Sequence, residues 1–195
     1  MLSYVLVVVA VILFVIMYVH SANSVREELY VIQTNVSTFR ADMLKEKMPI
    51  VLHDKIVNAL ETTTTLCKYM YFKISSDDTS SFINHLVHCR SRYTVLHNTS
   101  SYPITMNVIH GKHWKDIRLI SNNSSPSMSI ATCNDYDVYH ADILQRIPSF
   151  EMILPQDVMI ILPHRWSYHI KNTDANAFAD LTRLHVHDII TANKF

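Results

Sequence analysis

The chain begins with an apolar run that contains no charged side chain and no strong helix breaker. Residues 4–19 read YVLVVVAVILFVIMYV, and residues 1–3 extend the run to about the length that spans the hydrocarbon core of a bilayer. A membrane-spanning helix fits a segment of this length and composition. We therefore predict a single-pass transmembrane anchor at residues 1–22, through which the protein contacts a lipid membrane.

A cleaved signal peptide is the alternative interpretation of the same segment. Small residues at positions 21–24 are compatible with a cleavage site. However, no basic segment precedes the apolar run, and the run is longer than the roughly 7 to 15 residues of a typical signal-peptide core. The orientation in the membrane is not predicted, because the charges of Arg26, Glu27 and Glu28 nearly cancel.

The rest of the chain is long enough for one domain with a substantial core. Lys plus Arg and Asp plus Glu number 17 each, so the chain lacks the basic excess of a nucleic-acid-binding surface, and we expect no nucleic acid partner. Cys67, Cys89 and Cys133 are widely spaced and form no metal or redox motif. We interpret them as free thiols in a reducing compartment, with one disulfide and a leftover thiol as the alternative.

Asparagine bears on both the turns and the cellular location of this chain. Gly111 is the single glycine, so Asn and Asp are expected in turns with positive φ. Asn-x-Ser/Thr triplets begin at Asn35, Asn98, Asn122 and Asn123, and chance explains them in a chain rich in these residues. They would matter only in the secretory lumen, so a lumenal glycoprotein that binds a ligand or receptor is one further hypothesis.

Residues 23–47 are predicted to form a helical stalk. Val25, Leu29, Ile32 and Val36 are spaced four, three and four residues apart, which suits one face of a helix. The folded domain would then occupy residues 48–195.

Short apolar runs divided by polar clusters dominate the domain and predict a mainly β fold with flanking helices. Strands are expected at residues 66–74, 93–96, 104–109, 117–120, 128–131, 150–154, 158–162 and 166–170. Helices are expected at residues 81–89 and 177–190, although the alternation at 184–187 permits a strand there instead. A barrel or a sandwich of antiparallel strands accommodates this pattern.

The most specific segment is residues 150–172, which read FEMILPQDVMIILPHRWSYHIKN. It resembles the second half of the double-stranded β-helix in the cupin-like Jumonji family. The match places Asp157 at a turn, an apolar strand after it, and then Pro163 and Trp166.

Upstream segments extend this resemblance to residues 48–172. Residues 94–99 are similar to the family's Thr-x-x-His-x-Asp motif, and residues 48–51 resemble the strand that opens such domains. The resemblance also places Thr94 and Lys112 at the 2-oxoglutarate site. Together with the anchor, it implies a transmembrane helix followed by a jelly-roll, cupin-like domain.

The iron-ligand positions of the family are only partly filled. Family enzymes bind Fe(II) through two His and one carboxylate. The resemblance places His97 at the first ligand position, but Thr99 at the carboxylate position and Tyr168 at the last His position. His169 comes one residue late and therefore faces the opposite side of a strand. We predict a catalytically inactive domain without a cofactor, in which Thr94 and Lys112 are remnants.

An Fe(II)- and 2-oxoglutarate-dependent oxygenase with a degenerate triad is the alternative function. It requires that His97 and His169 converge on one point beside a carboxylate, for which Asp116 and Asp137 are the candidates. A bulge after Trp166 would bring His169 inward.

The functional expectation rests on the anchor and the resemblance together. Cupin-like jelly rolls on a membrane anchor, in chains with few Gly and many Ile, Asn, Thr and Tyr, are similar to proteins of large DNA viruses that carry an internal membrane. This similarity implies a minor virion component that links the internal membrane to the capsid. We expect a membrane-anchored structural or interaction protein with protein partners, located in a virion internal membrane or the host endoplasmic reticulum.

Overall fold

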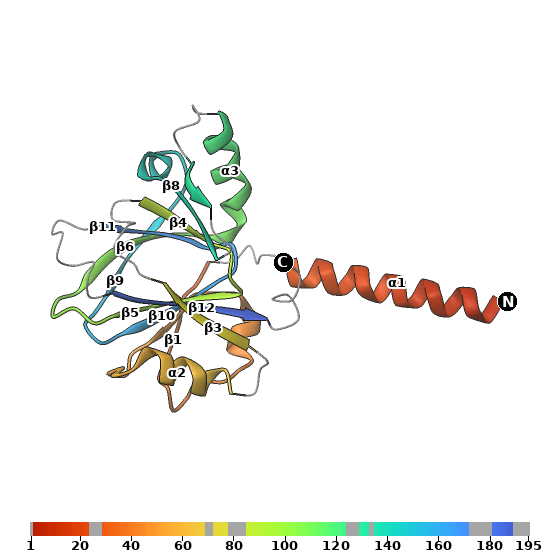
Figure 1. The fold of residues 1–195 in the computed structure, drawn as a ribbon, viewed down its shortest axis with the longest axis horizontal. Helices are drawn as coiled ribbons and strands as arrows, with labels where there is room; N and C mark the ends of the chain where they lie inside the picture. The colour runs from red at the N-terminus through yellow and green to blue at the C-terminus, as the bar shows by residue number, and fades with distance from the viewer. Residues whose placement is uncertain are drawn as a thin grey trace.

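The computed structural model describes residues 2–23, 29–68, 72–77, 85–123, 129–132, 135–171 and 181–188. These residues form three α-helices and twelve β-strands, and the strands build two six-stranded sheets that stack as a sandwich (Figure 1). The mainly β class that the short apolar runs predict is confirmed. The helices are α1 (Leu2–Asn23), α2 (Ala59–Leu66) and α3 (Trp114–Asn123).

The two sheets are named A and B. From edge to edge, sheet A contains β1 (Ile32–Thr34), β2 (Ile50–Leu52), β10 (Met159–Pro163), β5 (Tyr93–Asn98), β12 (Leu181–Asp188) and β3 (Phe72–Asp77). Sheet B contains β7 (Ser129–Thr132), β8 (Tyr136–His140), β4 (His85–Cys89), β11 (Ser167–Lys171), β6 (Ile104–Ile109) and β9 (Phe150–Leu154). Neighbouring strands are antiparallel, except that β1 and β2 are parallel.

The strand order interleaves the two halves of the chain. In sheet A, β12 lies between β3 and β5, and β10 lies on the other side of β5. In sheet B, β11 lies between β4 and β6, and β9 lies on the other side of β6. Because the late strands are inserted between the early ones, neither half can complete its sheets without the other.

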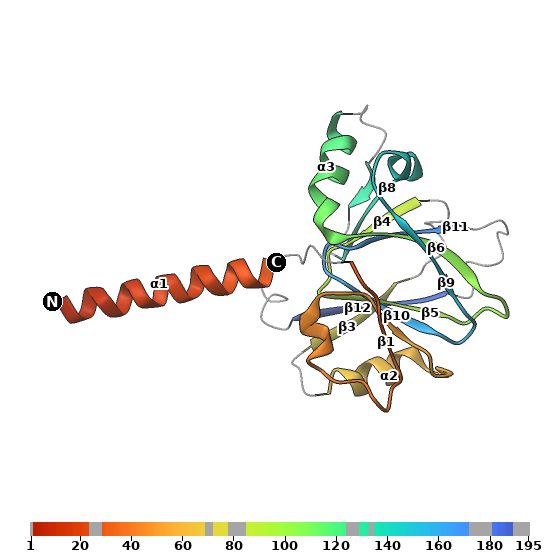
Figure 2. The ribbon, with the colours of Figure 1, turned by 180° about the vertical axis from the view of Figure 1, so that it is seen from behind.

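Alternation along the strands divides the buried side chains among three layers. On β6, Met106 and Val108 lie in the layer between the sheets, whereas Ile109 packs on the outer side of sheet B. Helix α2 covers the outer face of sheet A, and its Leu66 belongs to the buried layer between α2 and that sheet. Helix α3 and the 3-10 helix η3 (Ala141–Gln145) cover the outer face of sheet B through Ile117 and Ile143 (Figures 1 and 2). Two further 3-10 helices are η1 (Met43–Glu46) and η2 (Gly111–His113).

Helix α1 stands away from the sandwich in both views (Figures 1 and 2). Its side chains are described for residues 5–19, and every one of them is exposed. Among the described residues, no helix is long and apolar enough to cross a membrane.

The helical stalk predicted for residues 23–47 is wrong where the structure describes this segment beyond α1, at residues 29–47. Strand β1 forms there because the segment pairs with β2 at the edge of sheet A. Ile32 pairs with Ile50, and the Ile32 N–H donates to the Pro49 carbonyl at 2.9 Å. A turn follows, in which the Thr38 N–H donates to the Asn35 carbonyl at 3.1 Å. The sandwich therefore begins before residue 48. Residues 24–28 lie outside the described residues.

For two segments, the sequence predicts the wrong type of secondary structure. Within residues 81–89, expected as a helix, the described part is strand β4, because β8 and β11 pair with it on either side. Within residues 117–120, expected as a strand, the chain is in α3, and Ile117 packs against sheet B. Residues 81–84 lie outside the described residues.

The structure also corrects the predictions for residues 66–74 and 177–190. Of residues 66–74, the last part begins β3, whereas Leu66 closes helix α2. In the closing segment the alternative is confirmed, because β12 is a strand that pairs with β5 and β3. The expected helix at 177–190 is therefore wrong over residues 181–188, and its remaining residues lie outside the described part of the chain.

Among the described residues, the left-handed backbone conformation is adopted by residues other than glycine. Positive φ occurs at Lys47 (56°), Asp157 (59°) and Arg165 (72°) and not at Gly111. Asp157 fits the expectation that Asp serves such turns, whereas Lys47 and Arg165 were not anticipated.

Candidate functional site

A polar cleft of about 410 Å³ lies between α3 and the outer face of sheet B. It is lined by side chains from α3, β4, β8 and the turns that follow β4 and β10. The lining residues are His88, Arg90, Trp114, Arg118, Ser121, Asn122, Asp137, Tyr139, His164 and Arg165.

The two turns of the cleft are held together by backbone hydrogen bonds. The His164 N–H donates to the Arg92 carbonyl at 3.0 Å, and the Arg165 N–H donates to the Cys89 carbonyl at 2.9 Å. The His164 ring adds a bond from Nδ1 to the Arg90 carbonyl at 2.9 Å. These bonds fix the turn after β10 against the turn after β4, and so fix Arg90 and Arg165 on one side of the cleft.

Positive charge dominates the cleft. Arg90, Arg118 and Arg165 come from three separate segments, and Asp137 is the one acidic residue among the lining residues. Arg90 forms an ion pair with Asp137 at 3.3 Å. The Arg165 guanidinium lies over the Trp114 ring, 4.6 Å from its centre, which favours a cation–π contact.

The two histidines of the cleft are neutral near pH 7. Burial, followed by the charges of His164, Arg165 and Arg90, lowers the pKa of His88 to about 3. The His88 Nδ1 is 2.8 Å from the Ser167 hydroxyl oxygen, and this hydrogen bond holds the ring. Burial and the neighbouring Arg165 lower the pKa of His164 as well. The fixed positive charge of the cleft therefore belongs to its arginines.

A second basic group lies inside the sandwich. Arg183 on β12 is 1% exposed, and its guanidinium lies 5.3 Å from the ring centre of Tyr136 and 5.7 Å from that of Tyr168. His185, two residues along the same strand, stacks on Tyr136 at 5.5 Å. The faces of Tyr136 and Tyr168 offset part of the cost of burying a cation at this depth.

Thr94, predicted as a remnant of a cosubstrate site, belongs to this interior group. Its hydroxyl lies 2.9 Å from the Ser91 hydroxyl and 3.4 Å from His185 Nδ1. Cys89 is close by, and burial raises the pKa of its thiol to about 12, although Thr94 and Arg183 act in the opposite direction. Lys112, the other predicted remnant, is exposed on η2.

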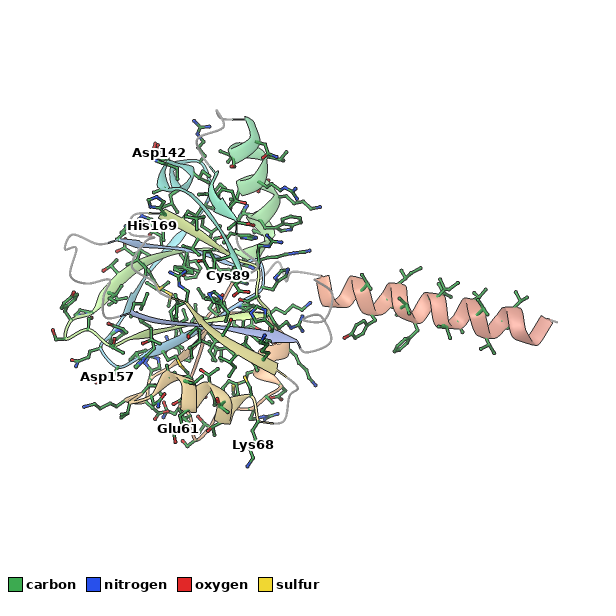
Figure 3. The ribbon with its side chains drawn as sticks, viewed as in Figure 1. Glu61, Lys68, Cys89, Asp142, Asp157 and His169 are labelled. Carbon is green, nitrogen blue, oxygen red and sulfur yellow. The ribbon has the colours of Figure 1, made fainter. Side chains whose placement is uncertain are left out.

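His97 and His169, the predicted metal ligands of the oxygenase alternative, lie on different sheets. His97 shares a face of β5 with Tyr93 and Val95, which pack toward α2. His169 lies on the outer face of β11, while Tyr168 before it points into the core, as the one-residue offset implies. Figure 3 shows His169 in one layer and Asp157, the neighbour of His97, in the other.

The acidic candidates are engaged elsewhere. Asp116 contacts His113 at 3.0 Å, and Asp137 pairs with Arg90. In the part of the chain that the structure describes, no three His, Cys, Asp or Glu side chains gather as a metal site requires. The described residues therefore do not fit the Fe(II) centre that the resemblance implies.

Two features predicted from residue type alone can be placed. Cys67 and Cys89 are free thiols, whereas Cys133 lies outside the described residues. Of the possible glycosylation sites, Asn35 and Asn122 are exposed, but Asn98 is fully buried. The Asn98 amide donates to the carbonyls of Leu154 and Tyr102, both at 2.9 Å, so the folded domain leaves no room for a glycan there.

The cleft arginines were not found by reasoning from sequence, because they lie at positions 90, 118 and 165 and only the fold brings them together. A local signal did exist. The segments His88-Cys89-Arg90 and His164-Arg165-Trp166 each put a histidine and an arginine at the end of an apolar strand. Comparison with models of known protein families and with curated protein sequences finds no match to this chain.

Proposed function

We propose that the protein is a membrane-tethered binding module, in which α1 lies in a lipid bilayer and the β-sandwich presents a ligand or partner site outside it. The observation that carries this proposal is the exposure of α1. Its large apolar side chains at residues 5–19 are between 42% (Val8) and 72% (Met17) exposed, on all sides of the helix. An apolar surface of this extent is unfavourable in water and calls for lipid or other apolar surroundings.

The length of α1 supports the same assignment. It has 22 residues, which at a rise of about 1.5 Å per residue gives roughly 33 Å. The hydrocarbon core of a bilayer is about 30 Å thick. The length of α1 is close to this thickness and no Asp, Glu, Lys or Arg falls within it, so the proposed tether rests on the sequence of the helix and on its exposed apolar side chains.

The strand order supports a finer description of the sandwich as a double-stranded β-helix of the jelly-roll, cupin-like type. The interleaved pairs β3–β12, β12–β5 and β5–β10 in one sheet match the pairs β4–β11, β11–β6 and β6–β9 in the other. This is the arrangement that the Jumonji-like resemblance implies. Fold alone does not assign an activity, so the function is argued from the site.

Binding is favoured over oxygenation because His97 and His169 diverge while the cleft arginines converge. The proposal extends to a link between a membrane and a protein assembly, such as an internal membrane and a capsid in a large DNA virus. That part rests on the sequence likeness and the anchor.

Membrane extraction of the full chain tests the tether. Wild type is expected to stay with membranes through an alkaline carbonate wash. A variant with Val9→Lys and Leu13→Lys is expected to be released, because each lysine at the centre of a span costs about 2.5 to 3.5 kcal/mol of insertion. Val9→Leu with Leu13→Val is the matched control. Release of the wild type would refute the tether, and an intact mass shortened by the first 20 or so residues would favour the signal peptide.

Iron content and 2-oxoglutarate binding of the full chain test the oxygenase alternative. The proposal expects no stoichiometric iron in either wild type or His97→Ala. Iron that is bound by wild type and lost in His97→Ala would establish a metal site and overturn the assignment as a binding module.

A further inference from the structure

We propose that the cleft between α3 and the outer face of sheet B binds a phosphate group of the phosphomonoester type. The inference goes beyond the membrane tether, because it assigns a ligand chemistry to residues that the tether does not use. It rests on the size of the cleft, the number and source of its arginines, and its one carboxylate.

The size of the cleft fits a small molecule or a headgroup. Its volume of about 410 Å³ lies within the range of about 300 to 1,000 Å³ that small-ligand sites occupy. The lining differs from that of a typical apolar pocket, because all of its described residues except Trp114 and Tyr139 have polar or charged side chains. A polar, charged ligand is therefore the match.

The arginines indicate an anion. Arg90, Arg118 and Arg165 reach the cleft from the turn after β4, from α3 and from the turn after β10. Like charges from independent segments repel one another, so such a group is favourable when an anion lies between them. Guanidinium groups suit phosphate because their paired N–H donors match two of its oxygens.

The charge balance favours a dianion over a single carboxylate. Asp137 is paired with Arg90 at 3.3 Å, which offsets one of the three positive charges of the lining. Among the described lining residues there are three guanidinium groups and one carboxylate, which suits a ligand with more than one negative charge, and a phosphomonoester carries about −1.5 to −2 near pH 7. The neutral rings of His88 and His164 add hydrogen-bonding capacity without adding charge.

The position of the cleft allows two sources of the phosphate. Helix α3 lies on the side of the sandwich from which α1 extends, in both views (Figures 1 and 2). A lipid headgroup at the bilayer surface and a soluble phosphate compound can therefore both reach the cleft. The shared chemistry is the phosphate group, and the two arms of the experiment separate its sources.

The first arm measures calorimetric binding of inorganic phosphate to the full chain in micelles of a neutral detergent. Saturable binding with a dissociation constant of about 1 mM or lower is expected for wild type. Arg118→Gln and Arg165→Gln are each expected to weaken it at least about tenfold, since each removes charge-assisted hydrogen bonds. Arg40→Gln, an exposed arginine that pairs with Asp42, is the matched control and should leave binding unchanged.

The second arm repeats the titration in nanodiscs of phosphatidylcholine with and without phosphatidic acid. Weaker apparent binding of inorganic phosphate by wild type in the nanodiscs that contain phosphatidic acid assigns the cleft to a lipid headgroup. Equal binding in both nanodiscs assigns it to a soluble phosphate compound. Absence of saturable binding by wild type, or binding equal in Arg118→Gln, Arg165→Gln and Arg40→Gln, would overturn the proposal. Inorganic phosphate reaches the cleft whether or not α1 inserts, so failure here is distinct from failure of the tether.

Discussion

The interior of the sandwich and the cleft outside sheet B both hold arginine and histidine against aromatic rings, yet they differ in access to water. Arg183 is 1% exposed between Tyr136 and Tyr168, whereas Arg118 in the cleft is exposed. A buried cation can neither exchange its partners nor leave without unfolding the core, while exposed cations can bind and release a ligand. The same residue types therefore serve stability in one region and recognition in the other.

The largest expected effect separates these two roles directly. Arg183→Ala should destabilise the domain by about 3 kcal/mol or more, because it leaves a cavity and removes two cation–π contacts at once. Arg118→Ala should change stability by no more than about 0.5 kcal/mol. Denaturant unfolding of the full chain in detergent, followed by circular dichroism, measures both. Equal losses in the two variants would remove the distinction.

Two asparagines allow the same comparison for uncharged groups. Asn98→Ala should lower the free energy of unfolding by about 2 to 3 kcal/mol, because the Leu154 carbonyl loses the amide donor and the Ser100 N–H and hydroxyl lose Asn98 Oδ1 as an acceptor. Asn122→Ala, at the exposed rim of the cleft, is the control and should be nearly neutral. The same denaturant titration is the measurement. A loss well below about 2 kcal/mol in Asn98→Ala would indicate that water replaces the amide.

Acid should destabilise the domain through its histidines. The folded pKa of His88 is about 3, below the ordinary value of 6.5, so the unfolded chain binds the extra proton between these pH values. Stability from this group is therefore complete above pH 6.5 and falls as pH drops, by about 1.4 kcal/mol for each pH unit. Burial lowers the pKa of His97, His164 and His169 in the same direction.

The measurement is the slope of unfolding free energy between pH 6.5 and 5. His88→Gln should reduce the slope by about 1.4 kcal/mol per pH unit. Parallel slopes for wild type and His88→Gln would show that His88 is not held neutral by the fold.

The smallest effect concerns the cleft alone. Asp137→Asn removes the partner of Arg90 and should tighten binding of inorganic phosphate by about threefold to tenfold, since the cleft gains one net positive charge. The free energy of unfolding should change by less than about 1 kcal/mol, as for other partly exposed ion pairs. Calorimetric titration and denaturant unfolding measure the two. Weaker phosphate binding would mean that Asp137 positions Arg90 instead of competing with the ligand.

The central β-strands were predictable from sequence because their apolar runs were short and bounded by polar clusters. The predicted strands 104–109 and 150–154 have the same bounds as β6 and β9. The pattern failed where a short apolar run suits either structure, as at residues 117–120. There Ile117 and Ile120 are three residues apart on one helical face of α3. Strand β1 was missed for a different reason. It pairs with β2, which is distant along the chain, so no local pattern marks it as a strand.

The candidate site was less predictable than the fold. Thr94 and Tyr168, which the resemblance placed at a cosubstrate position and a metal-ligand position, both lie in the interior of the sandwich. The cleft was not foreseen, because it requires that positions 90, 118 and 165 meet, and such distances are set by the sheet order and not by any spacing in the chain.

At Arg165, which has a left-handed backbone conformation, the residue that suits the turn differs from the residue that suits the cleft. A side chain with a Cβ in this conformation costs roughly 1 kcal/mol relative to glycine. Glycine there should therefore make the turn after β10 more stable while deleting one of the cleft's three guanidinium groups. A sequence optimised for folding alone would place glycine at this position. An arginine in its place is what selection for recognition at the expense of stability would leave behind, in a chain that has glycine only at position 111.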